Sequence, residues 1–128
     1  MKKKVDHYVG ELYECIDIIR LFQLGYVEGN ILKYIWRRDK KGCYDEDMDK
    51  VIHYISFLSD VPPNREPRPY PYTVVESVIT EVMGDSDNQA LRDFLEFFFD
   101  CIILSEGYSD NSRERLTHLI NRANKEEG

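Results

Sequence analysis

All five prolines of this chain stand between positions 62 and 71, in the segment VPPNREPRPYP that begins at residue 61. Proline has no amide hydrogen to donate and its ring clashes with the preceding helical turn. The segment therefore excludes a helix and favours an extended, polyproline-like strap. It serves either as a spacer or as a strap laid over a partner subunit. We expect one compact domain of 128 residues, divided into 1–60, a strap at 61–73, and 74–128.

On both sides of the strap, apolar residues recur every three or four positions, which is the helical period. We therefore predict an all-α fold, a compact bundle of about five helices in two groups joined by the strap. Capping boxes and glycines set the expected ends. The expected helices run over about 11–24 with Gly25 as the stop, 29–39, 45–58, from the capping box at Thr73 to Gly84, from the capping box at Ser86 to Leu104, and 112–124.

The segment from Leu91 to Leu104 is apolar almost all round when it is drawn as a helix. Such a helix must be buried on several sides. In a domain this small, one of those sides is expected to be a second copy of the chain, and we predict a homo-oligomer.

The chain has no run of about 18 apolar residues, so a membrane span is not predicted. The basic start is followed by the polar residues Asp6, His7 and Glu11 and not by an apolar signal core, which argues against secretion. Cys15, Cys43 and Cys101 are odd in number and widely spaced, as expected for reduced thiols. These features predict a cytoplasmic protein.

The formal net charge is −7, of which residues 1–60 carry −1 and residues 61–128 carry −6. An acidic protein gains little from the phosphates of a nucleic-acid duplex, so duplex binding is not expected. Arg37, Arg38, Lys40 and Lys41 nevertheless form one local basic cluster. It indicates either a small anionic ligand or a solvated helix end, where cations also favour the helix dipole.

The expected second helix has one polar face, formed by Asn30, Lys33, Tyr34 and Arg37 within about 100° of arc. An amide, an ammonium, a phenol and a guanidinium are groups that hold phosphate, carboxylate or a nucleobase.

Asp47, Lys50 and Tyr54 repeat that spacing on the third helix, next to the apolar Val51 and Leu58. Their face should therefore point toward the core, where Asp47 and Lys50 would each need a partner. Two such faces predict a charged seam between antiparallel helices. The seam is either a binding site or a structural salt bridge from Asp47 to Lys33 or Arg37.

The chain contains neither the P-loop nor the Gly-x-Gly-x-x-Gly motif, and its three histidines show no metal-ligand spacing. Acidic pairs are more suggestive. Glu11-x-x-Glu14 and Glu46-x-x-Asp49 resemble the pattern with which all-α nucleotide pyrophosphohydrolases bind magnesium between helices. The alternative is solvated helix surface.

Taken in order, several elements of the first sixty residues resemble a family of small bacteriophage proteins. The matching elements are Asp6-His7-Tyr8, Tyr13-Glu14-Cys15-Ile16-Asp17, Gly29-Asn30-x-x-Lys33-Tyr34-x-x-Arg37, Lys41-Gly42 and Asp47-x-x-Lys50-x-x-x-Tyr54. This family is largely of unknown function and includes a coliphage nucleotide kinase, described as phosphorylating deoxynucleoside monophosphates without a P-loop. Residues 61–128 resemble no family that we can name.

The resemblance implies a phage protein of the infected bacterial cytoplasm that binds a nucleotide and acts as a kinase-like phosphotransferase. Phosphate would be held by Lys33, Arg37 and Lys41, and Asn30 would read a base edge or orient a phosphate. Tyr8, Tyr34 or Tyr54 would stack on the base, near His7. If the protein is catalytic, Mg²⁺ would be held by the carboxylates Glu14, Asp17 and Asp47, with Lys50 orienting Asp47.

Two other functions fit the sequence. In the first, the protein sequesters a host nucleotide or defence signal without turnover, which would make it an anti-defence protein. In the second, it modulates a host or phage enzyme through the strap and the apolar helix in its second half.

Overall fold

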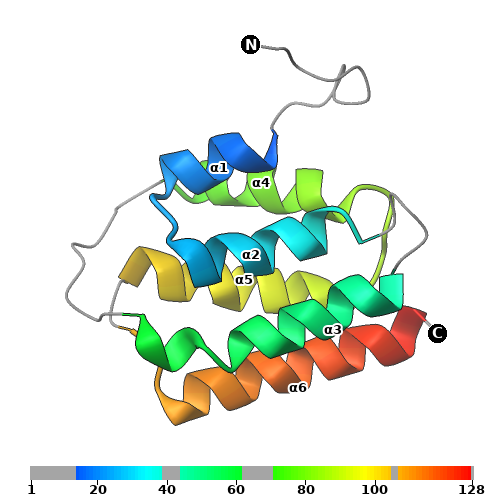
Figure 1. Ribbon diagram of the computed structural model, residues 1–128. Helices are drawn as coiled ribbons and strands as arrows, with labels where there is room; N and C mark the ends of the chain where they lie inside the picture. Colours follow the sequence, from blue (N-terminus) through cyan, green and yellow to red (C-terminus); the bar gives the residue numbers. More distant parts are fainter. Residues whose placement is uncertain (1–13, 39–43, 62–70, 105–106, 128) are drawn as a thin grey trace.

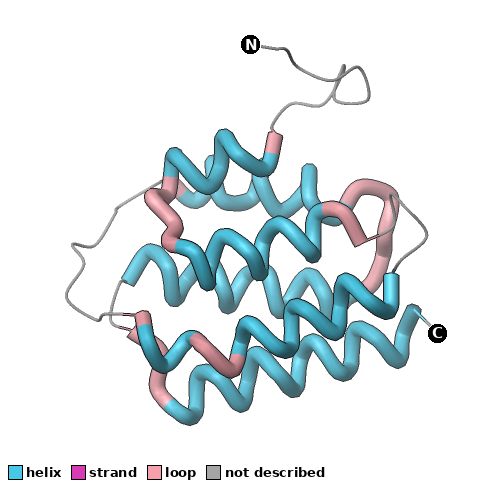
Figure 2. The backbone as a smooth tube through the Cα atoms, in the orientation of Figure 1, coloured by secondary structure: helices cyan, strands magenta, loops and turns pink. Residues whose placement is uncertain are grey.

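A computed structural model describes residues 14–38, 44–61, 71–104 and 107–127. In these ranges the chain is helical, with short loops and no strands, as Figure 2 shows. The elements are α1 (Cys15–Leu21), α2 (Tyr26–Trp36), α3 (Tyr44–Ile55), a 3₁₀ turn at Leu58–Asp60, α4 (Tyr72–Met83), α5 (Gln89–Leu104) and α6 (Asp110–Glu127). The all-α prediction is confirmed for these residues, and their six α-helices correspond to the six ranges expected above, one more than the approximate number of five. The proline-rich segment at 62–70 lies outside them.

The two halves of the chain form one core. In Figure 1, α2 runs between α1 and α3, and α6 lies along the side of α3 that faces away from α2. Contacts of α3 with α6 and of α2 with α4 join the helices before the proline segment to those after it. The core is built from both sets, with fully buried side chains such as Phe22, Ile31, Val51, Phe98 and Leu116.

The apolar helix α5 is covered within the single chain. Phe94, Phe98 and Phe99 are fully buried, and the ring of Phe97 packs under the Arg115 guanidinium, 5.0 Å from its centroid. No described helix is long and apolar enough to cross a membrane. Neighbouring helices therefore bury much of the apolar surface of α5, although Leu104 at its end is 56% exposed, and the homo-oligomer stays a prediction.

Of the expected helix boundaries, those at Gly25 and Thr73 are wrong and the one at Gly84 is confirmed. The first helix ends at Leu21, and Gly25 is the N-cap of α2, which begins at Tyr26. The box at Thr73 is not used, because α4 begins at Tyr72 with Pro71 as its N-cap, so Thr73 already lies inside the helix. Gly84 does end α4, with φ of +59°, a conformation that glycine adopts without strain.

Asn88, and not Ser86, caps α5. Its Oδ1 accepts a hydrogen bond from the backbone N–H of Leu91, at 3.0 Å. Its Nδ2 donates to the carbonyl of Ala123 at 2.9 Å and to Glu127 Oε2 at 3.0 Å. One buried amide therefore fixes the start of α5 against the end of α6. Because asparagine is as good a cap as serine, sequence alone did not separate them.

Two further polar contacts fix α2. At its start, Glu28 is 1% exposed, and its Oε2 accepts a hydrogen bond from the hydroxyl of Tyr108, at 2.6 Å. After its end, Arg38 is 3% exposed. The Nη1 of Arg38 donates to the carbonyls of Ile35 and Val82, and its Nη2 donates to that of Met83. These contacts hold α2 in place while its opposite face stays available.

Candidate functional site

The polar faces of α2 and α3 meet around the ring of Tyr34. The Lys33 ammonium lies 5.4 Å from the centroid of this ring, the Arg37 guanidinium carbon 4.9 Å and the Lys50 ammonium 5.0 Å. Cations are attracted to the negative face of an aromatic ring. The structure thus brings together, from two helices, the three cations that the sequence pattern placed on facing surfaces. We call Lys33, Tyr34, Arg37 and Lys50 the cation cluster.

Asp47 is the counterion of Arg37. Its side chain is 2% exposed, and its Oδ1 accepts hydrogen bonds from Nε and Nη2 of Arg37, each at 3.3 Å. A buried carboxylate is costly unless it is paired, and its place in the first turn of α3 adds the favourable helix dipole. Of the two salt bridges expected for Asp47, the one with Arg37 is therefore present.

Lys33 and Lys50 are exposed, and within the described parts of the chain neither ammonium lies in ion-pair distance of a carboxylate. The expectation that Lys50 points toward the core is wrong, because only Asp47 of that pair is buried. Since Asp47 neutralises Arg37, the cluster keeps two positive charges without a carboxylate partner among the described residues. In a chain with a net charge of −7, this is a local reversal of sign.

Tyrosine rings continue the face away from the cations. Tyr54 lies parallel to Tyr34, with ring centroids 6.1 Å apart and an interplanar angle of 14°. Tyr26 meets Tyr54 edge-on at 5.9 Å, and their hydroxyl oxygens are 3.3 Å apart. The hydrogen bond with Tyr26 raises the pKa of Tyr54, so its phenol stays neutral at physiological pH. Flat neutral rings of this kind are suited to stacking on a nucleobase.

Asn30 is placed less favourably for the role expected of it. Its Nδ2 donates a hydrogen bond at 2.7 Å to the carbonyl of Tyr26, in the same helix. This bond commits one of the groups with which an asparagine reads a base edge.

The carboxylates proposed to hold magnesium do not form a common site. Glu14 and Asp17 form a capping box with each other at the start of α1, and Asp47 is occupied by Arg37. In the described part of the chain, no three His, Cys, Asp or Glu side chains are grouped so that they could hold a metal ion. Magnesium binding therefore stays a prediction without a described ligand set. His7, Tyr8 and Lys41 lie outside the described residues.

Sequence reasoning missed three aromatic side chains of this face, namely Tyr26, His53 and Phe57. The ring centroids of His53 and Phe57 are 4.8 Å apart, and Phe57 lies 6.2 Å from Tyr54. The spacing of Tyr54 and Phe57 at i and i+3, one turn of helix, was the available signal.

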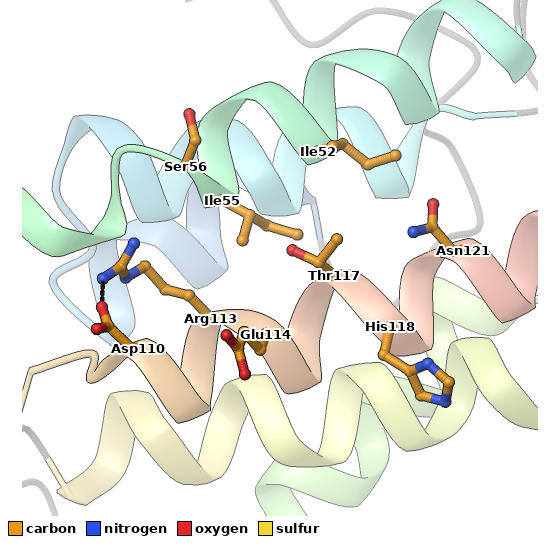
Figure 3. A pocket seen from close by; sticks show the side chains of 9 residues that line it. All are labelled: Ile52, Ile55, Ser56, Asp110, Arg113, Glu114, Thr117, His118 and Asn121. Atoms are coloured by element: carbon orange, nitrogen blue, oxygen red, sulfur yellow. Dashed lines mark hydrogen bonds and ion pairs between the residues drawn. The ribbon is translucent and has the colours of Figure 1, made fainter.

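A separate groove lies between α3 and α6, drawn in Figure 3, with a volume of about 550 Å³. Ile52 and Ile55 of α3 and Thr117 of α6 point into it, and Arg113 is paired with Asp110 at one end. At 100° per residue, this side of α3 is opposite to the side that carries Lys50 and Tyr54. The groove is therefore not part of the cation cluster.

The fold and this face define an all-helical protein with an exposed surface of cations and aromatic rings. Residues 2–56 match the model of a family described as a protein of unknown function, DUF3310. The matched stretch includes the whole of α1, α2 and α3, and hence the whole cation cluster. No curated protein and no solved structure matched the chain.

Proposed function

We propose that the face formed by α2 and α3 binds a nucleotide through its phosphate. The observation that carries this proposal is the cation cluster, in which Lys33 and Lys50 flank Tyr34 without a carboxylate partner among the described residues. Unpaired ammonium groups held together repel each other, and an anion between them removes that cost. Phosphate is the anion that Lys and Arg side chains hold best, through short charge-assisted hydrogen bonds.

A nucleoside monophosphate fits the charge of the cluster. A phosphate monoester carries about −1.5 to −2 at pH 7. The ammonium groups of Lys33 and Lys50, which have no carboxylate partner among the described residues, match this charge, and Arg37 keeps donor hydrogens beyond the Nε and Nη2 that it gives to Asp47. The base would then lie on the tyrosine rings beyond Tyr34, with Tyr54 as the central stacking partner.

Phosphoryl transfer is the activity implied by the resemblance to the phage kinase. In the proposed site, Lys33, Lys50 and Arg37 would offset charge that develops on the transferred group. Asp47 acts in this proposal by positioning Arg37, in place of the catalytic role first expected for it. The same site would also serve a protein that sequesters a nucleotide without turnover, so binding and turnover are measured separately.

The test is isothermal titration calorimetry of the full chain with thymidine monophosphate, guanosine monophosphate, thymidine and inorganic phosphate. We expect one of the two nucleotides to bind more tightly than thymidine or phosphate alone. Lys33→Ala and Lys50→Ala should each weaken binding about 10- to 100-fold, because each removes a charge-assisted bond worth about 1.5–3 kcal/mol.

Lys125→Ala is the matched control, since it removes one exposed lysine from the far end of α6. Equal affinities of Lys33→Ala, Lys125→Ala and the unmodified chain would refute the site. Turnover is then assayed with ATP and magnesium. Tight binding with no diphosphate product would favour sequestration over the kinase activity.

A further inference from the structure

The aromatic surface is longer than one nucleobase needs. From Tyr34, ring-to-ring distances of 6.1 Å and 6.2 Å lead through Tyr54 to Phe57. His53 lies between the last two, 5.6 Å from Tyr54 and 4.8 Å from Phe57. The surface thus follows the last turn of α3 and continues beyond it.

The far end of this surface is open to solvent. His53 is exposed, and the side chain of Phe57 is 40% exposed. The planes of the two rings are 82° apart, so the rings meet edge to face and do not stack on each other. An exposed phenylalanine beside an exposed histidine leaves apolar ring surface in water, which a planar ligand would cover.

Among the described residues, the cations that contact aromatic rings of this surface lie at the other end. Lys33, Arg37 and Lys50 all surround Tyr34, and no described lysine or arginine makes a ring contact with His53, Tyr54 or Phe57. A long single strand carries a phosphodiester at every step and needs cations along its whole path, whereas a dinucleotide with a terminal phosphate carries only one phosphodiester besides the phosphate in the cation cluster. The observed order is instead one cluster for phosphate followed by successive rings.

We infer that the site takes two adjacent nucleobases, and that its ligand is a dinucleotide with a terminal phosphate. This inference rests on the proposed function. The terminal phosphate monoester lies in the cation cluster, and the first base stacks at Tyr54. The second base stacks on the edge formed by His53 and Phe57.

The test compares three thymidine ligands by calorimetry. They are thymidine monophosphate, the 5′-phosphorylated dithymidylate, and the same dithymidylate without its terminal phosphate. A further stacked base should tighten binding of the phosphorylated dinucleotide about 5- to 150-fold over the monophosphate. The dinucleotide without the terminal phosphate should bind more weakly than either.

Two variants locate the second base. Phe57→Ala and His53→Ala should remove most of the gain from the second nucleotide and leave the affinity for the monophosphate unchanged. The unchanged monophosphate affinity shows that the variant is folded. Tyr72→Ala, at a 71% exposed tyrosine on α4, is the matched control and should leave every affinity as it was.

The outcomes separate the two proposals. If the monophosphate binds and the dinucleotide brings no gain, only the second base position is refuted. If no thymidine or guanosine phosphate binds, both proposals fail together. A phosphorylated decathymidylate that binds far more tightly than the dinucleotide would overturn the dinucleotide in favour of a long single strand.

Discussion

The face of α2 and α3 differs from the surface of α4, α5 and α6 in how its cations are balanced. On the second surface, arginines lie beside carboxylates: Arg92 is paired with Glu76 and Glu96, and Arg122 with Glu126. Around Tyr34, only one of three cations, Arg37, is paired with a carboxylate of the described residues, Asp47. Paired charges at helical spacing complete a solvated surface, whereas an excess of one sign calls for an anion from outside.

The largest expected effect is on nucleotide binding at the face of α2 and α3, which carries the cation cluster. The double variant Lys33→Ala/Lys50→Ala should weaken nucleotide binding at least about 100-fold, because two charge-assisted contacts are lost. Its thermal midpoint should stay the same or rise slightly, since removing two like charges relieves repulsion. Calorimetry and thermal melts give both quantities. A clear fall in the thermal midpoint would mean that these lysines stabilise the fold, as the paired arginines of the other surface do.

Arg37 should affect both nucleotide binding and the stability of the fold, because it belongs to the cation cluster and is paired with the buried Asp47. Arg37→Met leaves the buried Asp47 carboxylate without its partner and should lower the free energy of unfolding by about 1–3 kcal/mol. Urea unfolding measures this loss. The double variant Arg37→Met/Asp47→Leu should recover part of it, because it removes the buried charge together with its partner. If the single variant is as stable as the unmodified chain, the ion pair does not contribute to the free energy of unfolding.

The raised pKa values of the two described cysteines, Cys15 and Cys101, should make the stability of the fold depend on pH. Burial raises the pKa of Cys15 to about 12 against the opposing charge of Lys33, and raises that of Cys101 to about 11 with help from Asp100 and Glu28. Both thiols have a folded pKa above the unfolded value of about 8.5. Their contribution to stability is complete below that value and is lost as pH rises through the folded pKa.

The melting temperature should therefore fall by a few degrees between pH 8.5 and 10.5. The fall should be smaller in Cys15→Ala and in Cys101→Ala, each compared with its own midpoint at pH 7. Thermal melts across this range provide the measurement. A fall of the same size in both variants would assign the effect to other groups.

The smallest effect is expected on the surface of α4, α5 and α6, where arginines are paired with carboxylates. Arg92→Ala breaks the contacts with Glu76 and Glu96, which are partly exposed, and should cost less than about 1 kcal/mol. Nucleotide binding should not change, because α5 contributes nothing to the cation cluster. A tenfold loss of affinity in this variant would contradict the division of the molecule into two regions.

Periodicity in the sequence was sufficient for the helices and for the pairing of two polar faces. The spacing of the polar residues predicted that α2 and α3 would meet through these faces, and they do so through Arg37 with Asp47 and through Lys50 over Tyr34. Spacing fixes the side of a helix and not the depth of a side chain. This is why Asp47 and Lys50, assigned to one face, turn out buried and exposed, respectively.

Caps and long-range partners were less predictable. Ser86 and Asn88 are both good caps, and the choice depends on the carbonyl of Ala123, which lies 35 residues away from Asn88. The aromatic surface depends in the same way on α3 reaching Tyr26 of α2. Such contacts are set by packing between helices, and the local pattern carries no information about them.

Arg38 connects the ends of two helices that are far apart in the sequence, and we expect these ends to open together. Its guanidinium holds the last turn of α2 through Ile35 and the last turn of α4 through Val82 and Met83, which are 44 and 45 residues away. Opening either helix end exposes carbonyls that the same side chain satisfies, so the two ends form one cooperative unit for amide hydrogen exchange. A nucleotide held by Lys33 and Arg37 would thus slow exchange at the end of α4, a helix that it never touches.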